Sequence, residues 1–456
     1  MKLVLLWTDV LVWALVVVLL IWAWVILRSP HIKKTWYTIF KSGIAMASSV
    51  VLLFYLFFTL LDSIHLRLAL PDEAQKSQTV MYETQMVSLL DLMFAHNIQH
   101  TERTYSAPFA TVEYTSSIVV DKEGKTKQVY LPLKHVSSED AFMGKSLRAL
   151  GVGIVVSILL VLLHIWWREK RRFVEACREI VKGKSTLPWR TAYVTFMLLV
   201  ITFVWLYMLS YSYHVLGTDK VGGDVLYQSF KSIRTGVLIG ILTTLIMLPV
   251  AVVLGVSAGL FGGWVDDVIQ YLYTTLSSIP GVLLIAAGVL SMQVMMDNHP
   301  TWFETTLERS DLRLLFLIII LGITSWTSLC RLLRAETLKI SQMEFVTAAK
   351  VFGVSRFTII RRHIVPNLMH IILISVVLDF SGLVLAEAVL SYVGVGVDPT
   401  MHSWGNMINQ ARLEMAREPM VWWSLFSAFV FMFILVLAAN LFSDRIQKVL
   451  DPRNNT

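Results

Sequence analysis

Nine long stretches of this 456-residue chain are apolar and almost free of charged side chains. A helix that crosses a membrane needs about 20 such residues, because each adds about 1.5 Å to a path of about 30 Å through hydrocarbon. The ninth stretch, 368–392, carries two acids, and the other eight contain no Asp, Glu, Lys or Arg: 10–27, 42–61, 149–167, 191–211, 235–264, 268–296, 314–330 and 421–443. The chain is therefore expected to be an all-α polytopic membrane protein with about nine transmembrane helices.

Composition and charge support this class and give an orientation. Hydrophobic residues make up 56% of the chain and charged residues 16%, which is too apolar for a set of soluble domains. Loops rich in Lys and Arg stay on the cytoplasmic side, which predicts that 28–41, 168–190 and 331–363 are inside. Segment 62–146 has eleven acids and eight bases and is expected outside. The net charge of +7 thus reflects membrane topology and does not indicate a nucleic-acid partner.

These assignments divide the chain into four parts. Two N-terminal transmembrane helices occupy 1–61, and an extracytoplasmic domain occupies 62–146. A third transmembrane helix and a basic cytoplasmic loop fill 147–190. The remaining residues, 191–456, form a six-helix core with a cytoplasmic loop at 335–366. We call the three N-terminal helices and the external domain the N-terminal additions.

The external segment is expected to be a small α+β insertion. Residues 110–120 and 128–136 alternate in part between apolar and polar side chains and flank the polar stretch 121–125, a pattern typical of a β-hairpin. Residues 72–100 are expected to be helical. The insertion could contact a partner outside the membrane. The alternative is an ordered spacer, which is favoured because the sequence contains no recognisable binding motif.

Small residues at helical spacing predict close helix packing in the core. Without a hydrophobic drive in lipid, helices associate where glycines let their backbones approach. Such glycines lie four residues apart at Gly236 and Gly240, and again at Gly255, Gly259 and Gly263.

Two prolines interrupt the apolar stretches of the core. Pro249 and Pro280 lie inside 235–264 and 268–296, and each removes a backbone hydrogen bond. Both are expected to kink their helices.

Two acids, Asp379 and Glu387, lie inside the ninth apolar stretch. An ionised acid at the centre of a bilayer costs about 2.5–3.5 kcal/mol on insertion scales, so such residues usually face a bundle interior or a wet path. They are candidates for the translocation path, and pairing with a neighbouring helix is an equal alternative.

The charged amphipathic segment 341–366 lies between two apolar stretches and has the features of a docking helix. Ser341 and Glu344 match a capping box that begins a helix, and Gly353 suits the left-handed residue beyond its end. One apolar face is expected from Phe345, Ala348, Ala349 and Phe352, with Lys350 pointing elsewhere. Such a helix can place its apolar face in a groove of a partner.

The chain shows no catalytic or cofactor signature of its own. Gly144-Lys145-Ser146 and Gly183-Lys184-Ser185 lack the first glycine of a phosphate-binding loop, since Glu139 and Arg178 stand there. His96 and His100 are spaced as a helical pair, but no further metal ligand is patterned around them. Cys177 and Cys330 are both expected near the cytoplasmic side, where a structural disulfide is unfavourable. We therefore expect a non-enzymatic chain that binds no metal or cofactor.

The docking segment resembles the cytoplasmic coupling loop of ABC importer permeases. The resemblance rests on Ala348-Ala349-x-x-x-Gly353 followed by Ile364-x-Pro366-Asn367, with Thr347 where that family usually has Glu. It extends over 211–453, through these landmarks: Leu216-Gly217-Thr218-Asp219-x-x-Gly222-Gly223-Asp224-Val225, Gly262-Gly263-Trp264-x-Asp266, Ser278-Ile279-Pro280, Glu387-Ala388-x-Leu390-Ser391-Tyr392-x-Gly394-x-Gly396, Ser403-Trp404-Gly405 and Leu450-Asp451-Pro452-Arg453. Gly223 stands where a common version of the first landmark has Arg.

These landmarks are similar to the second permease subunit of the dipeptide, oligopeptide and nickel class of ABC importers. The resemblance implies a bacterial inner-membrane subunit that forms half of a channel with a second, related permease. It also implies two ABC ATPase subunits, which hold ATP and Mg, and an extracytoplasmic substrate-binding protein. Residues Ser341, Glu344, Phe345, Thr347, Ala348, Ala349, Lys350, Phe352, Gly353 and Pro366 would then couple the channel to the ATPases.

The leading interpretation is a peptide importer permease, and three alternatives stay open. One is an importer of nickel or another small solute in the same class. Another is a non-transporting membrane sensor built on a permease core, with 62–146 as its receptor. The third is a secondary transporter. It is disfavoured because that class predicts several intramembrane charges and an inverted repeat, whereas this chain has two intramembrane acids and no evident repeat.

Overall fold

The computed structural model describes residues 2–69, 82–120, 126–136, 142–169, 173–303 and 305–450. Within these ranges, nine helices are long and apolar enough to cross a membrane. They are α1 (Trp7–Arg28), α3 (Gly43–Asp62), α6 (Phe142–Arg168), α8 (Trp189–Leu209), α9 (Val225–Phe261), α11 (Gly281–Asn298), α12 (Thr306–Ser341), α15 (Val365–Tyr392) with the short turns before it, and α17 (Trp423–Leu450). The predicted all-α polytopic fold is confirmed.

Two short helices join spans on the side expected to be cytoplasmic. They are α2 (Pro30–Phe40) and α7 (Phe173–Val181). In α7, Ala176 and Ile180 are buried against Ile165 of α6 and Tyr193 of α8. Ala176 and Ile180, one helical turn apart, thus pack the basic loop against the two helices that it connects.

One predicted span is divided in two. The stretch 268–296 was expected to be a single helix kinked at Pro280, but α10 (Gly263–Ser278) ends before Ile279, and α11 begins after Pro280. Ile279 is extended, with ψ 130°, as expected for a residue before proline, whose ring disfavours the helical region there. Pro280 therefore breaks the helix. Pro249, by contrast, lies within the continuous helix α9.

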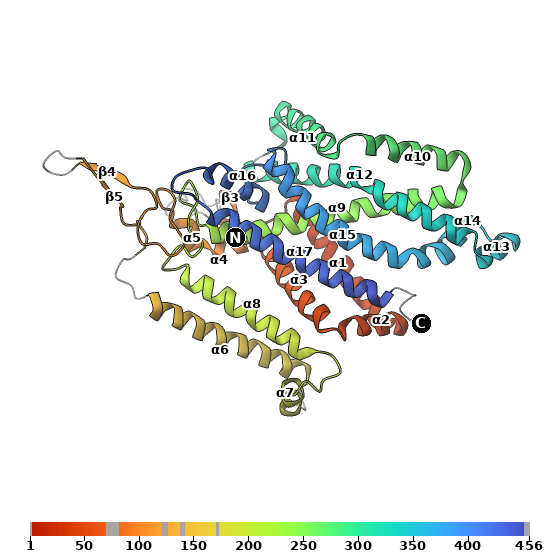
Figure 1. Ribbon diagram of the computed structural model, residues 1–456, viewed down its shortest axis with the longest axis horizontal. Coiled ribbons are helices and arrows are strands. Elements are labelled where there is room, and N and C mark those ends of the chain that lie inside the picture. The colour runs from red at the N-terminus through yellow and green to blue at the C-terminus, as the bar shows by residue number, and fades with distance from the viewer. Residues whose placement is uncertain are drawn as a thin grey trace, which may run out of the picture. The chain divides into compact units, whose positions relative to one another are not determined.

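The chain forms two compact units. The first contains residues 1–5, 18–236 and 401–442, and the second contains 6–17, 237–400 and 443–456. In the first unit, α6 and α8 pack along one another (Figure 1). At Gly153 of α6, an added Cβ atom would lie only 3.3 Å from the backbone of Ile201, so this pair is close-packed. Helix α3 packs against α8.

The predicted α+β insertion in the first unit is confirmed, with differences in detail. A three-stranded antiparallel sheet joins β1 (Lys2–Val4), β2 (His65–Ala69) and β3 (Tyr82–Ser88), and α4 (Leu89–Met93) and α5 (Ala95–Gln99) follow. The prediction of a helix over 72–100 is thus wrong for β3, which is a strand paired with β2, and is confirmed for α4 and α5. Residues 70–81 lie outside the described residues. Since β1 pairs with β2, the N-terminal strand lies beside the external segment.

The predicted hairpin is present. Strands β4 (Ser117–Val120) and β5 (Thr126–Val129) pair antiparallel, with Ser117 opposite Val129 (Figure 1). Both strands are shorter than the predicted 110–120 and 128–136, and a separate bridge joins Val112 to Pro132. The predicted turn, 121–125, lies outside the described residues.

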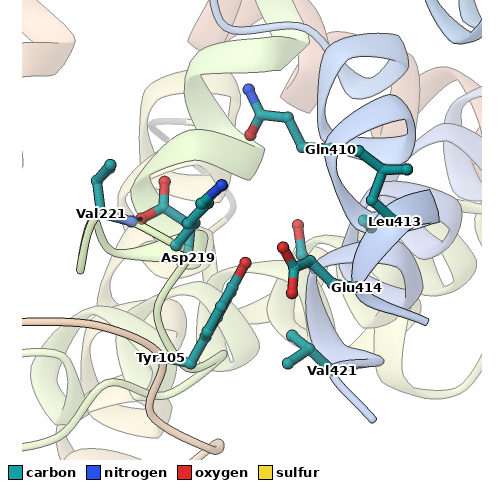
Figure 2. Close-up of a pocket in the computed structure, with 10 residues that line it drawn as sticks. Tyr105, Asp219, Val221, Gln410, Leu413, Glu414 and Val421 are labelled. Carbon is teal, nitrogen blue, oxygen red and sulfur yellow. Dashed lines mark hydrogen bonds between the residues drawn. The ribbon is translucent and has the colours of Figure 1, made fainter. Parts of the chain in front are cut away.

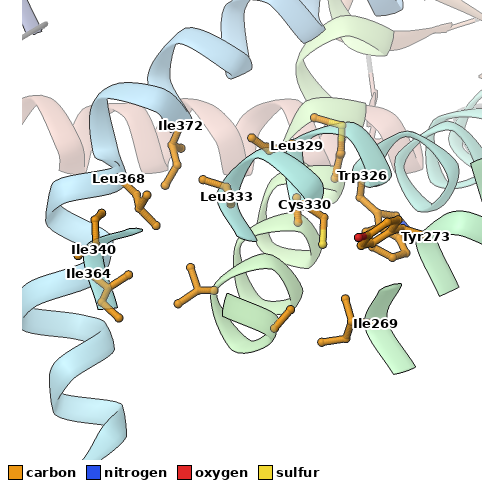
Figure 3. Close-up of a cluster of buried hydrophobic side chains, with 14 of the residues drawn as sticks. Ile269, Tyr273, Trp326, Leu329, Cys330, Leu333, Ile340, Ile364, Leu368 and Ile372 are labelled. Carbon is orange, nitrogen blue, oxygen red and sulfur yellow. The ribbon is translucent and has the colours of Figure 1, made fainter. Parts of the chain in front are cut away.

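The second unit is organised around a buried apolar cluster (Figure 3). Side chains from α9, α10, α12, α15 and the short helices before α15 meet there, among them Ile269, Tyr273, Leu329, Leu333, Leu368 and Ile372. Two predicted glycines bring α9 against α12 in this cluster. An added Cβ atom would lie 2.8 Å from the carbonyl oxygen of Cys330 at Gly255, and 2.6 Å from Thr337 at Gly259.

The remaining glycines of the pattern differ in their surroundings. An added Cβ atom would lie 2.5 Å from Phe380 at Gly240, in the second unit, and 2.6 Å from Trp404 at Gly236, in the first. Gly263 is an exception, because nothing lies within 4 Å of its Cβ position. It begins α10 with φ +55°, so its backbone conformation, and not helix packing, requires glycine.

Candidate functional site

The helix expected to dock on a partner is α13 (Glu344–Val351), in the second unit. The predicted capping box is wrong, because Ser341 is the last residue of α12 and its hydroxyl donates to the Leu338 carbonyl. Met343 precedes α13 in an extended conformation, without a side-chain cap. Glu344 still lies in the first turn, where a negative charge is favourable.

The predicted end of this helix is confirmed. Gly353 has φ +74°, in the left-handed region. The amide of Val354 donates to the Ala349 carbonyl at 3.0 Å, and the amide of Gly353 donates to Lys350 at 3.1 Å. This pair of bonds is a Schellman motif, which reverses the chain sharply and needs glycine at its left-handed residue.

The two faces of α13 differ from the expected arrangement at one residue. Val346 is completely buried, and Ala349 packs against the apolar cluster, so Ala349 belongs to the inner face. The outer face and the turn beyond it expose apolar side chains, which we call the coupling surface: Phe345, Ala348, Phe352 and Phe357, with Phe352 84% exposed. Exposed apolar side chains grouped on a short helix and the turn beyond it typically mark an interaction site.

The side chains of Lys350 and Thr347 make their hydrogen bonds away from the coupling surface. The ammonium group of Lys350 donates to the Ser341 carbonyl at 3.4 Å, and the Thr347 hydroxyl donates to the Met343 carbonyl at 3.2 Å. Both side chains therefore contact the turn between α12 and α13.

Pro366 lies in the first turn of α15, after the π-helical turn η3 (Ile360–Ile364). A proline lacks the amide hydrogen that would bond four residues back, which leaves the Arg362 carbonyl without that partner. The amide of Val365 bonds to Ile360, five residues back. The wider turn thus accommodates the proline where the loop enters α15.

An ion pair holds α10 beside α12 on the same side of this unit. Asp266 accepts two hydrogen bonds from Arg334, at 2.5 and 2.6 Å. These bonds, with the attraction of the guanidinium, keep the pKa of Asp266 below its usual value despite partial burial. This pair was not predicted, although Asp266 belongs to a landmark and Arg334 to a basic loop of the expected cytoplasmic side.

The two acids of α15 have different surroundings. Glu387 is 1% exposed and accepts a hydrogen bond from the Ser391 hydroxyl at 2.8 Å, and Ser391 in turn accepts from the Val397 amide. An added Cβ atom at Gly396 would lie 2.1 Å from the Ser391 oxygen, so the chain turns tightly over this pair. In Asp379, one carboxylate oxygen is buried and has no hydrogen-bond partner in the described part of the chain.

In the first unit, the external segment lies directly on the landmark loop before α9. We call this contact the external junction. The amide of Glu102 donates to the Gly222 carbonyl, and the amide of Thr218 donates to the Ser106 carbonyl, both at 3.1 Å. An added Cβ atom at Gly222 would overlap the Glu102 carbonyl, at 1.9 Å. The glycines of the landmark thus let two backbones touch.

Buried charged groups complete the external junction. His214 bonds Asp224 at 2.9 Å and lies 3.7 Å from Glu102. Burial lowers the pKa of His214, but hydrogen bonding and attraction from Asp224 and Glu102 outweigh it, and the pKa is raised. Asp224 also caps α9 by accepting from the Leu226 amide at 2.9 Å.

A second buried charge cluster ties α9 to the N-terminal additions. The ammonium group of Lys231 lies 2.6 Å from both Asp62, at the end of α3, and Asp91 of α4. Burial raises the pKa of Asp91, but Lys231 outweighs it and the pKa is lowered. These contacts join residues 169 and 140 positions apart, and no local pattern in the sequence indicates them.

The histidine pair of the external segment is joined by a third ring. The rings of His96 and His100 stack with centroids 3.9 Å apart, and His135 lies 4.5 Å from His100. Within the described ranges, no three His, Cys, Asp or Glu side chains are grouped to hold a metal ion.

Comparison with known proteins gives a family match and several relatives. Residues 251–456 match the family described as binding-protein-dependent transport system inner membrane component. The dipeptide transport system permease protein DppC of Bacillus subtilis is 30% identical over 240 residues, which cover 53% of this chain and 69% of the relative. The oligopeptide transport system permease protein OppC of Mycobacterium bovis is 31% identical over 243 residues, covering 53% and 77%.

Two further similarities were found. The glutathione transport system permease protein GsiD of Pectobacterium atrosepticum is 28% identical over 318 residues, covering 63% of this chain and 98% of the relative. Among solved structures, an inward-facing form of the MetNI methionine ABC transporter aligns with 49% of this chain and 96% of the other, with 18% identity and a TM-score of 0.37.

Proposed function

Because this chain belongs to the family of inner-membrane components of binding-protein-dependent transport systems, we propose that it is a permease subunit carrying peptides inward through an ABC importer. The names of its relatives, which transport dipeptides, oligopeptides and glutathione, support peptide-like solutes as the cargo. A second, related permease would complete the channel. An extracytoplasmic substrate-binding protein would deliver the cargo, and two ABC ATPase subunits, holding ATP and Mg, would drive it.

The coupling surface carries this proposal. Phe352 and Phe357 are 84% and 73% exposed at the end of a basic loop, and Gly353 fixes the turn between them. Burying one large apolar side chain stabilises a complex by about 1.5–3 kcal/mol. The coupling surface therefore offers enough apolar area for a partner's groove to hold α13 through a transport cycle.

The inner face of α13 supports transmission of a push. Val346 of α13 and Ile359 of α14 (Arg356–Ile359) are fully buried in the cluster that also contains Leu333 of α12 and Leu368 of α15. Close-packed side chains move together, so a displaced α13 would carry both long helices of this unit with it. ATPase closure would use this connection to switch the channel between outward-open and inward-open forms.

We assign different roles to the two intramembrane acids. Asp379 is the candidate for the translocation path, because its unpartnered buried oxygen can accept a hydrogen bond from a passing solute. Glu387 is assigned to holding the turn after α15, through Ser391.

Co-purification tests the coupling surface. Phe352→Ser should reduce the amount of ATPase recovered with the chain by at least about tenfold, since it removes the most exposed aromatic of the surface. Trp302→Ser is the matched control, because Trp302 is also exposed, at 53%, but lies in the short turn after α11. Equal recovery of ATPase with wild type and Phe352→Ser would refute the assignment.

A further inference from the structure

A pocket of about 340 Å³ opens in the first unit, where the external segment meets the core (Figure 2). Tyr105 comes from the external segment, and residues 219–221 come from the landmark loop. Glu414 and Gln410 come from α16 (Trp404–Glu414). The volume is at the low end of the range for small-molecule sites, about 300–1,000 Å³, so it suits a ligand of two or three amino-acid residues.

One wall of the pocket is acidic and fixed in place. The hydroxyl of Tyr105 points at the Glu414 carboxylate across the cavity (Figure 2). Burial, followed by the hydrogen bond and charge of Glu414, raises the pKa of Tyr105, and the charge of Asp219 adds to this. Arg417 contacts Glu414 at 3.3 Å, and Asp219 adds a second carboxylate beside this single guanidinium. The wall therefore keeps a negative potential.

Asp219 is held rigidly beside this wall. One of its oxygens accepts from the amides of Val221 and Gly223, at 3.0 and 2.7 Å, and the other accepts from Gln228 at 2.5 Å. Such bonds fix the orientation of the carboxylate and prevent it from turning away.

The rim of the pocket carries a positive charge. Lys220 and Gln410 line the pocket, are exposed, and have no hydrogen-bond or ionic partner within the described part of the chain. A free ammonium group at the rim would repel a lone cation and attract a carboxylate. Apolar side chains, Val221, Leu413 and Val421, fill the space around these groups.

We propose that this pocket binds short peptides as zwitterions, with the peptide ammonium group at Glu414 and Asp219 and the peptide carboxylate at Lys220. The two charged ends of the ligand match the two polarities of the pocket, and the apolar residues accept its side chains. This inference rests on the proposed peptide import, and it assigns a peptide site that involves the external segment through Tyr105.

The test measures binding to the full chain in lipid nanodiscs, without ATPases, by titration calorimetry. Dialanine should bind, and N-acetyl-dialanine and dialanine amide should each bind at least about tenfold more weakly, because each lacks one charge. Glu414→Gln should weaken the preference for the free amino end, because only Asp219 then faces the ammonium group, and Lys220→Met should abolish the preference for the free carboxyl end. Glu418→Gln and Lys134→Met, on exposed residues outside the pocket, should change nothing.

Three results would overturn the inference. They are equal binding of the three peptides, unchanged preferences in both pocket variants, and tighter binding of N-acetyl-lysine amide than of dialanine, which would identify a socket for a basic side chain. If Glu414→Gln does not fold, Lys220→Met decides alone, because Lys220 is exposed and its loss leaves the fold intact.

Uptake by the assembled transporter separates this inference from the proposed function. ATP-driven peptide uptake without binding to the pocket would overturn the pocket alone. Binding to the pocket without any uptake would support the pocket and contradict peptide import.

Discussion

At the scale of single residues, His214 is a buried titratable group that links the external segment to the core. Asp224 and Glu102 face it directly, and His135 interacts with it electrostatically. Its raised pKa means that the folded state binds a proton more tightly than the unfolded chain. The resulting stability is fully present below the unfolded pKa of about 6.5 and is lost as pH rises through the folded value.

The prediction concerns His214→Gln, which removes this proton-dependent contribution. We expect the variant to be less stable than wild type by about 1–3 kcal/mol at pH 6, since a hydrogen bond to a charged group is lost, and the difference should shrink by pH 9. Thermal unfolding at both pH values measures it. His299→Gln is the control, because the His299 ring is hydrogen-bonded to the Met295 carbonyl and stacks on the exposed Trp302, away from any buried carboxylate in the described residues. A difference that grows with pH would contradict the assignment.

Single residues also show what sequence could not supply. The span of α9 was expected to begin at 235, because Lys231 and Arg234 precede the charge-free stretch. The helix begins at Val225, and Lys231 lies inside it, paired with Asp62 and Asp91. A rule based on charge alone began the span ten residues late, because the partners of Lys231 are distant in the sequence.

At the scale of helices, backbone approach decides the packing of α9 on α12. An added Cβ atom at Gly259 would lie 2.6 Å from Thr337 and 2.8 Å from the Arg334 carbonyl. We expect Gly259→Leu to destabilise the protein by about 1–3 kcal/mol, through overpacking, and to lower the unfolding temperature in detergent.

Gly382 provides the matched control for this substitution. It lies in α15, is exposed, and has nothing within 4 Å of its Cβ position. Gly382→Leu should leave the unfolding temperature unchanged or slightly raised, because leucine is a better helix former than glycine. Equal losses for both variants would contradict the packing role of Gly259.

Elements whose identity depends on local chemistry were predicted well. The nine spans follow from long apolar stretches, and the end of α13 follows from Gly353. The errors arise where neighbours compete for the same residues. Ser341 stays in α12 instead of capping α13, and β3 pairs with β2 where a helix was expected. Pro280 ends a helix because the preceding Ile279 takes an extended conformation, an outcome that hydropathy does not encode.

At the scale of the whole molecule, the topology is a prediction that labelling can test. Lys127→Cys should react with a membrane-impermeant thiol reagent in intact cells, because β5 belongs to the external segment. Lys182→Cys and Lys350→Cys should react only after permeabilisation. The background replaces Cys177 and Cys330 and should give no signal. Strong labelling at position 182 but not at 127 would reverse the orientation of the chain.

The N-terminal additions are integrated with the core of the first unit. Lys231 of α9 contacts Asp62 and Asp91, and the landmark loop contacts residues 102–106. An ordered spacer would not need buried charges at its boundary, since such charges are costly unless paired. The external segment is therefore expected to affect transport and not only folding, as the pocket around Tyr105 also implies.

The most direct test of the central claim is uptake of radiolabelled dialanine into proteoliposomes that contain the chain with its partner permease, ATPases and binding protein. We predict accumulation with ATP and none with a non-hydrolysable analogue. Phe352→Ser should abolish this accumulation and Trp302→Ser should preserve it, because only Phe352 lies on the coupling surface. Accumulation that does not need ATP hydrolysis, or that persists in Phe352→Ser, would contradict a peptide permease coupled through α13.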